Sequence, residues 1–401
     1  MNVQRTHKGS FDAPQRRAYV NALFIIGTLG TLISPALLAA WSTLHWSQSQ
    51  LGLVAGIELA AMGAGSLTAV YWQRRWLWRP VALGALLVAV IANAFCATSG
   101  DLLVVSVARG LIGLAGGLLC GIYSAFLANI KSPVRLIAIT TFVQIGIEAI
   151  FVFFTPLVID RLGFGGLFAG MAVLFAMLIP CISALPQGWP ITDPESAGAA
   201  IHNAPSWRGY PLLLSFASYS VVQTGAYAFL GDFGQTAAHL SAQQTLRTIG
   251  VSLIFSALGP AAAYALDERG GLLVPIAGSI AVMGCAIFGA IWGSPSALTF
   301  FVSISLLQIA WAFLICKLYS ALIEANNLLV PAATTVSVFG SALGASLMGY
   351  LLDQRGLAGA LSLSMGAVAS TALLTLPFLR FNRASAPAQQ NSAVRSIASR
   401  S

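Results

Sequence analysis

The sequence predicts an all-α membrane protein with twelve transmembrane helices arranged in two pseudo-symmetric six-helix bundles. Of its 401 residues, 57% are hydrophobic and 8% are charged, whereas a soluble chain carries about 25% charged residues. Apolar runs of about 20 residues, the length that crosses a bilayer core of about 30 Å, separate the charges. Backbone groups in lipid must bond within the chain, so each run is expected to be a helix.

The helices can be placed in order along the chain. The first apolar run follows a polar, basic segment and has no cleavage-like end, so we interpret it as an uncleaved first helix. The five cysteines lie inside apolar runs without a C-x-x-C pair, which predicts neither a disulfide framework nor a metal site. The twelve runs are 19–40, 50–71, 80–98, 102–125, 136–158, 165–185, 209–231, 246–266, 272–292, 298–321, 329–352 and 357–379.

Basic residues gather in alternate loops, and this pattern predicts the orientation. With the N-terminus inside, the inner loops and tails hold most of the Lys and Arg, while the outer loops hold only Arg161, Arg247 and Arg355. The positive-inside rule therefore predicts cytoplasmic N- and C-termini. The net charge of +8 is explained by these loops, so we expect no nucleic-acid partner. More arginine than lysine, with abundant Ala and Gly, favours a bacterial inner membrane.

A polar linker divides the chain into two halves. We expect an N-terminal tail at 1–18, six-helix bundles at 19–185 and 209–379, a central cytoplasmic loop at 186–208, and a C-terminal tail at 380–401. The turn Asp160-Arg161-Leu162-Gly163 after the fifth helix is echoed by Asp353-Gln354-Arg355-Gly356 after the eleventh. Repeated halves with a site between them are the common plan of secondary transporters.

Local motifs support a family resemblance. The fourth helix carries Arg109 followed by spaced glycines, as in Arg109-Gly110-Leu111-Ile112-Gly113. The motif around the end of the second helix begins with Gly65-Ser66-Leu67, with Ala69 in place of an acidic residue and with Arg74 and Arg75 keeping the basic character. The loop after the eighth helix retains the acidic residue in Asp267-Glu268-Arg269-Gly270. Over about residues 19–379 the chain resembles the major facilitator superfamily.

The resemblance implies a transporter that works by alternating access. It assigns a gating or conformational role to the matching loop positions, which are Gly65, Arg74, Arg75, Asp267, Arg269 and Gly270. Exporters of the family often carry Gly-Pro-x-x-Gly-Gly in the fifth helix, where this chain has Thr155-Pro156-Leu157-Val158-Ile159-Asp160. Only the proline is kept, which weakens the likeness to drug exporters.

Three charged residues lie inside predicted helices of the first half: Glu58, Arg109 and Glu148. Charges in a bilayer core are costly and are usually functional, and similar depths allow packing to bring these three together. Arg109 balances one carboxylate, and the second is less costly when protonated, because a buried net charge is expensive. Because Glu148 is the deepest of the three, we interpret it as the proton-coupling group and Glu58 as the partner of Arg109. A purely structural salt-bridge cluster, or an Arg109 that binds an anionic substrate, remains an alternative.

The family resemblance implies a central cavity lined by helices one, four, seven and ten. Tyr219, Gln223 and Tyr227 recur every four residues and share one helix face. Such side chains suit an amphipathic or aromatic small molecule, although core packing is the alternative for each. The full set of substrate candidates is Asn21, Ser34, Arg109, Tyr219, Gln223, Tyr227, Gln308 and Trp311.

Small residues predict close helix packing. Gly113, Gly117 and Gly121 recur every four residues in the fourth helix and allow another helix to approach. Gly340 and Gly344 predict the same for the eleventh helix.

We therefore expect a proton-coupled secondary transporter of a small organic solute, with an organic or aromatic anion as one possibility. A multidrug or metabolite efflux antiporter and a non-transporting membrane sensor or assembly protein are the alternatives. No phosphate-binding loop, hydrolase motif or metal-ligand spacing is present, so we expect no enzyme, cofactor or metal. The expected partners are the solute, protons and the lipid bilayer, and we expect a monomer.

Overall fold

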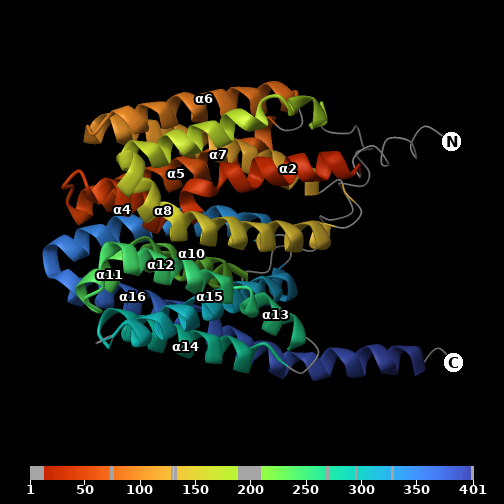
Figure 1. The fold of residues 1–401 in the computed structure, drawn as a ribbon. Coiled ribbons are helices and arrows are strands. Elements are labelled where there is room, and N and C mark those ends of the chain that lie inside the picture. Colours follow the sequence, from red (N-terminus) through yellow and green to blue (C-terminus); the bar gives the residue numbers. More distant parts are fainter. Residues whose placement is uncertain are drawn as a thin grey trace.

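The computed structural model describes residues 13–72, 76–127, 130, 133–187, 209–266, 271–293, 296–326 and 329–398, and within these ranges it contains helices and no strand. Figure 1 shows the helices running roughly alongside one another. They are α2 (Pro14–Gly27), α3 (Leu29–Leu32), α4 (Ser34–Ser42), α5 (Gln48–Trp72), α6 (Trp78–Thr98), α7 (Leu102–Leu127), α8 (Pro133–Leu178), η1 (Ile182–Ala184), α10 (Gly209–Ala228), α11 (Leu230–Thr236), α12 (Ala242–Phe255), α13 (Leu258–Ala265), α14 (Leu273–Ile291), α15 (Ala297–Asn326) and α16 (Val330–Ala398).

Within the described ranges, eight helices have the length and apolar composition needed to cross a membrane. Two of them, α8 with 46 residues and α16 with 69, each contain two of the predicted transmembrane helices. A bilayer core needs only about 20. Each bends sharply at a glycine with positive φ, Gly163 at 69° and Gly356 at 57°, where a side chain would be strained. Together with the interrupted first and seventh runs, this arrangement is consistent with twelve crossings.

The first predicted helix is interrupted rather than continuous. It breaks at Thr28 and Ile33 into α2, α3 and α4. Pro35 has no N–H to continue the helical ladder, and the Ala36 N–H bonds Ile33 instead of Leu32. The Leu32 carbonyl is therefore left without a helical partner, and it is available to another element.

Several helix ends differ from the sequence prediction. The sixth helix, expected to reach residue 185, ends at Leu178 and is followed by η1. The tenth extends beyond 321 to Asn326. The backbone of α16 continues through Ala398, into the segment expected to be a tail. Residues 188–208 of the expected central loop lie outside the described ranges.

Elements of the two predicted halves occupy different sides of the molecule in Figure 1, with α2 to α8 above and α10 to α16 below. Two pairs of helices make most of the contact between them: α5 packs against α16, and α8 packs against α12, while α4 makes smaller contacts with α10, α11 and α12. Small residues make both contacts close. A Cβ on Gly349 would overlap the Gln48 carbonyl of α5, and a Cβ on Gly250 would lie within 3.0 Å of Phe153 of α8.

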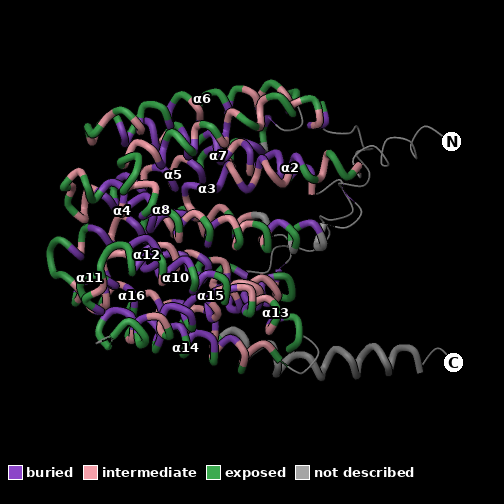
Figure 2. The backbone as a smooth tube through the Cα atoms, viewed as in Figure 1, coloured by how far each residue is buried: buried purple, intermediate pink, exposed green. Residues whose placement is uncertain are grey.

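The prediction of close packing at the helix-four glycines is confirmed. A Cβ on Gly113 or Gly117 would overlap backbone atoms of α5, so these positions hold the two helices together. In the same way, Gly340 and Gly344 meet the backbone of α10. The opposite stripe of α7, at Leu103, Val107 and Leu111, is exposed. Figure 2 shows buried positions gathered between the helices and exposed ones along α6 and α14, as expected for lipid-facing surfaces.

Candidate substrate and proton site

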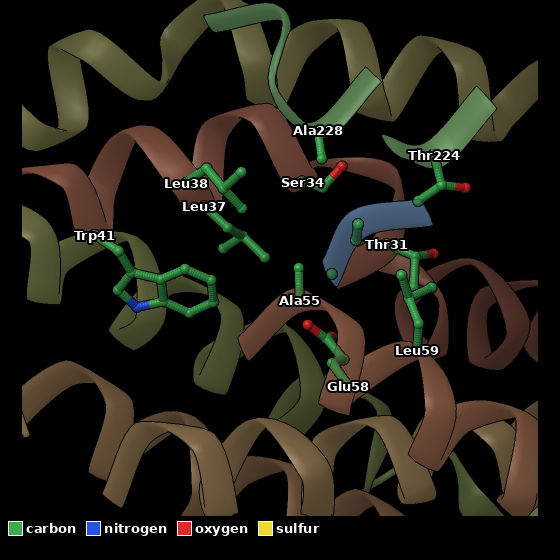
Figure 3. Close-up of a pocket in the computed structure, with 12 residues that line it drawn as sticks. Thr31, Ser34, Leu37, Leu38, Trp41, Ala55, Glu58, Leu59, Thr224 and Ala228 are labelled. Atoms are coloured by element: carbon green, nitrogen blue, oxygen red, sulfur yellow. The ribbon is translucent and has the colours of Figure 1, made fainter. Parts of the chain in front are cut away.

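A small cavity lies where the two predicted halves meet. The first half contributes Thr31, Ser34, Trp41 and Glu58, and the second contributes residues of α10 and α16 such as Thr224. Figure 3 shows the Thr31, Ser34 and Thr224 hydroxyls and the Glu58 carboxylate among leucine and alanine side chains. The wall is therefore mostly apolar with a few polar groups, which is the usual make-up of a small-molecule site.

Beside this cavity, Glu58 of α5 and Arg109 of α7 form a buried ion pair. The Arg109 Nε donates to Glu58 Oε2 at 2.9 Å, and Nη2 donates to Oε1, so the contact has two parallel hydrogen bonds. The Arg109 side chain is completely buried. Its Nη1 has no hydrogen-bond partner among the described residues. Two-point geometry suits a planar guanidinium, and Glu58 balances its charge.

Helix one supports the pair from one side. The Trp41 ring centroid lies 5.6 Å from the Arg109 Cζ, which is a cation–π contact. A Cβ on Gly30 would overlap both the Glu58 carboxylate and the Arg109 guanidinium. A glycine at this position therefore lets the pair sit against the backbone of α3.

Glu148 of α8 has a different partner from the Glu58–Arg109 pair. It is 8% exposed, and its Oε1 lies 2.5 Å from the Tyr227 hydroxyl of α10. The same hydroxyl lies 2.9 Å from the carbonyl oxygen of Leu32, the group left free by the break in helix one. Tyr227 of the second half therefore meets two groups of the first half.

The expected meeting of three charges is thus only partly found. Glu58 and Arg109 pair as the sequence suggested, while Glu148 contacts a tyrosine and makes no ion pair among the described residues. The separation follows from α8 packing against α12 and α2 rather than closely against α7. Charge balance predicted that one carboxylate pairs with Arg109, and the depth of Glu148 assigned that pair to Glu58, but neither argument predicted the contacts that Glu148 makes.

The substrate candidates fall into different environments. Ser34 lines the cavity. Asn21 accepts a hydrogen bond from Thr140 at 2.7 Å, and Tyr219 donates to the Trp311 carbonyl at 2.9 Å, so both connect helices. The Trp311 ring stands edge-on to Tyr227, with centroids 5.5 Å apart.

Two other candidates are amide side chains. Gln308 is fully buried, and neither polar atom of its amide has a partner among the described residues. Gln223 is half-buried.

The loop candidates can be located only in part. Gly65 packs against the backbone of α7 at Leu114 and Gly117. Arg74, Arg75, Asp267, Arg269 and Gly270 lie outside the described residues.

One group of contacts was not anticipated. At the start of α5, the backbone N–H groups of Gln48 and Ser49 donate to the Asp353 carboxylate of α16, at 2.9 and 2.7 Å. The Gln48 side chain donates to Asp232 of α11 at 3.0 Å. We call these four residues the α5 rim. Ser47 and Gln50 form a capping box there, and their S-x-x-Q spacing was a readable signal for a helix start.

Comparison with known proteins supports the fold. A family model described as the Major Facilitator Superfamily matches residues 20–327. A search of curated proteins finds no match. The fold resembles that of nucleoside transporter NupG, with 14% identity, TM-score 0.68, and 91% and 99% of the two chains covered. It also resembles that of a D-xylose–proton symporter, with 15% identity, TM-score 0.68, and 90% and 97% covered.

A third solved structure resembles the chain to a similar degree. The peptide transporter POT in complex with sulfate has 13% identity and a TM-score of 0.69, with 92% and 95% of the two chains covered. At such identities the likeness concerns the fold. The family match covers more than half of the 401 residues, and the chain is a transporter rather than an enzyme: it belongs to the major facilitator superfamily.

Proposed function

We propose that this transporter moves a small organic solute by alternating access and couples the movement to protons through Glu148. The observation that carries the proposal is the set of contacts around Tyr227. A tyrosine hydroxyl has one proton to donate, yet its oxygen lies within hydrogen-bond distance of both the Leu32 carbonyl and Glu148. A carbonyl only accepts, so both contacts are satisfied together only when Glu148 brings a proton of its own.

Protonation of Glu148 also agrees with the charges nearby. Glu58 already neutralises Arg109, so the charge of Glu148 would have no partner. Burial of an unpartnered neutral polar group costs about 2–7 kcal/mol, and burial of an unpaired ionised carboxylate costs more, so such a carboxylate takes up a proton instead. When the site opens to water, hydration lowers the cost of ionising Glu148. Glu148 would then hold a proton while the site is closed and release it when the site opens.

For the solute we favour a neutral, hydroxyl-bearing molecule with an apolar or aromatic face. The cavity offers the Thr31, Ser34 and Thr224 hydroxyls beside the Trp41 ring. Arg109 was a candidate to bind an anionic substrate, but its charge is paired with Glu58 and its side chain is completely buried. We therefore favour a neutral solute over an anion. Structurally similar proteins include transporters of nucleosides and of D-xylose, so nucleosides and pentoses are the first solutes to test. We infer a location in a bacterial inner membrane with both termini cytoplasmic, which places the α5 rim outside.

The test is a thermal-shift screen at pH 6 and pH 8, followed by transport in proteoliposomes. Binding to the folded state raises the melting temperature by mass action. For a solute that binds, Glu148→Gln is expected to abolish accumulation driven by a proton gradient while keeping solute exchange without a gradient. Loss of both activities, or accumulation equal to that of the unmodified chain, would contradict proton coupling at Glu148.

A further inference from the structure

The α5 rim joins the two halves through a helix start. The first N–H groups of a helix lack partners within it. In α5 the capping box satisfies the Gln50 N–H through the Ser47 hydroxyl at 3.3 Å. The Gln48 and Ser49 N–H groups are satisfied by the Asp353 carboxylate, which is about 300 residues away in the sequence. A negative charge at this position also interacts favourably with the helix dipole.

The reach of Asp353 depends on a close crossing one turn earlier in α16. Gly349 lies four residues before Asp353, on the same helix face. Its Cα packs so closely on α5 that a Cβ would overlap the Gln48 carbonyl. Gly52 forms the other side of this contact. The absence of side chains at both positions brings the carboxylate over the helix start.

The first half repeats this arrangement incompletely. Its partner helix α12 starts with the same capping box, formed by Ser241 and Gln244. Asp160 stands in the matching turn of the first half, but it makes no hydrogen bond to α12 among the described residues. A shift of 193 positions relates Asp160 to Asp353, and it places Pro156 where α16 has Gly349. Pro156 carries a side chain at the position where Gly349 carries none.

We propose that Asp353 is a latch that holds the α5 rim closed by capping α5 across the two halves, and that the chain has this latch in the second repeat only. The inference rests on the proposed alternating access, because opening of the rim must carry α16 away from the start of α5. The Gln48 bond to Asp232 links α11 to the same point. When the rim opens, water replaces Asp353 at the two N–H groups, so the latch is reversible.

The test measures how often the rim opens. A single cysteine replaces Ala228, which lines the cavity and is 1% exposed, in a chain whose five native cysteines are removed. Its alkylation by a membrane-impermeant maleimide, added to the side that the α5 rim faces, reports the open population. Asp353→Asn and Asp353→Ala are expected to raise the rate between about twofold and thirtyfold, the range that corresponds to loss of an N-terminal cap.

Two further variants separate the possible outcomes. Asp160→Asn is the matched control and is expected to leave the rate unchanged, while Gly349→Leu forces α16 away from α5 and is expected to raise it. The latch is refuted if the Asp353 variants react like the parent chain while Gly349→Leu reacts faster, or if Asp160→Asn accelerates the reaction equally. If Gly349→Leu also leaves the rate unchanged, the rim does not open and the proposed alternating access fails instead.

Discussion

At the scale of single residues, the Glu58–Arg109 pair shows how a buried charge is tolerated. Two hydrogen bonds, the Trp41 ring and the backbone at Gly30 surround it. Replacing both partners of a buried pair is often nearly neutral, whereas removing one leaves an uncompensated charge. The two partners differ, because a carboxylate can take up a proton while a guanidinium stays charged.

We therefore expect Glu58→Gln to lower the stability most, by about 3–5 kcal/mol. Arg109→Gln is expected to cost less, since Glu58 can then become neutral, and the double variant less than Glu58→Gln alone. Melting temperatures of the three purified variants provide the measurement. Additive effects of the two single changes would show that the pair does not act as a unit.

Gly30 gives a second prediction at this scale. Gly30→Ala places a Cβ on both charged groups, and such overpacking typically costs about 1–3 kcal/mol. Gly84→Ala in α6 is the matched control, because nothing lies within 4 Å of its added Cβ. We expect a lower melting temperature for Gly30→Ala alone, and equal melting temperatures of the two variants would contradict the close approach.

At the scale of elements, two helices start in the same way but are supported differently. Both α5 and α12 carry a Ser-x-x-Gln capping box. Among the residues that the structure describes, α5 alone of the two also receives a carboxylate from the other half. The first turn of α12 therefore depends on its own serine cap, whereas the first turn of α5 is capped by Ser47 and Asp353 together.

Removal of the serine caps should show this difference. Ser241→Ala is expected to cost about 0.5–2 kcal/mol, the usual loss for an N-terminal cap. Ser47→Ala is expected to cost less, because Asp353 still holds two of the N–H groups. Thermal melting of both variants, and of each combined with Asp353→Ala, measures the difference. A larger cost for Ser47→Ala than for Ser241→Ala would contradict the shared cap.

At the scale of the whole molecule, two helix pairs carry most of the contact between the halves, α5 with α16 and α8 with α12, and α4 adds smaller contacts with α10, α11 and α12. Each crossing has a glycine, Gly349 or Gly250, at which an added Cβ would collide with the partner helix. Glycines at a crossing allow backbones to approach, and in the α5–α16 pair glycines stand on both sides, at Gly52 and Gly349. Such a contact suits the proposed alternating access, in which the two halves move against each other.

A bulky residue at this crossing should therefore stop transport without preventing folding. Gly349→Leu is expected to lower the rate of solute exchange in proteoliposomes about tenfold or more, because the added side chain overlaps α5 and opposes closure at the α5 rim by about 1–3 kcal/mol. Gly366→Leu in the same α16 is the control, since its added Cβ meets nothing within 4 Å. Equal exchange by both variants would exclude a functional role for the crossing.

The sequence by itself determined the all-helical membrane fold, the family and the pairing of Glu58 with Arg109. Those features follow from the length of apolar runs, from local motifs and from charge balance, all of which are written in a linear order. Only the tertiary structure decided that Glu148 meets Tyr227 and Leu32, and that Asp353 caps α5. These contacts join residues of different halves. They depend on how each helix is rotated about its axis and on the break in helix one, and neither feature can be predicted from the pattern of residue types along the chain.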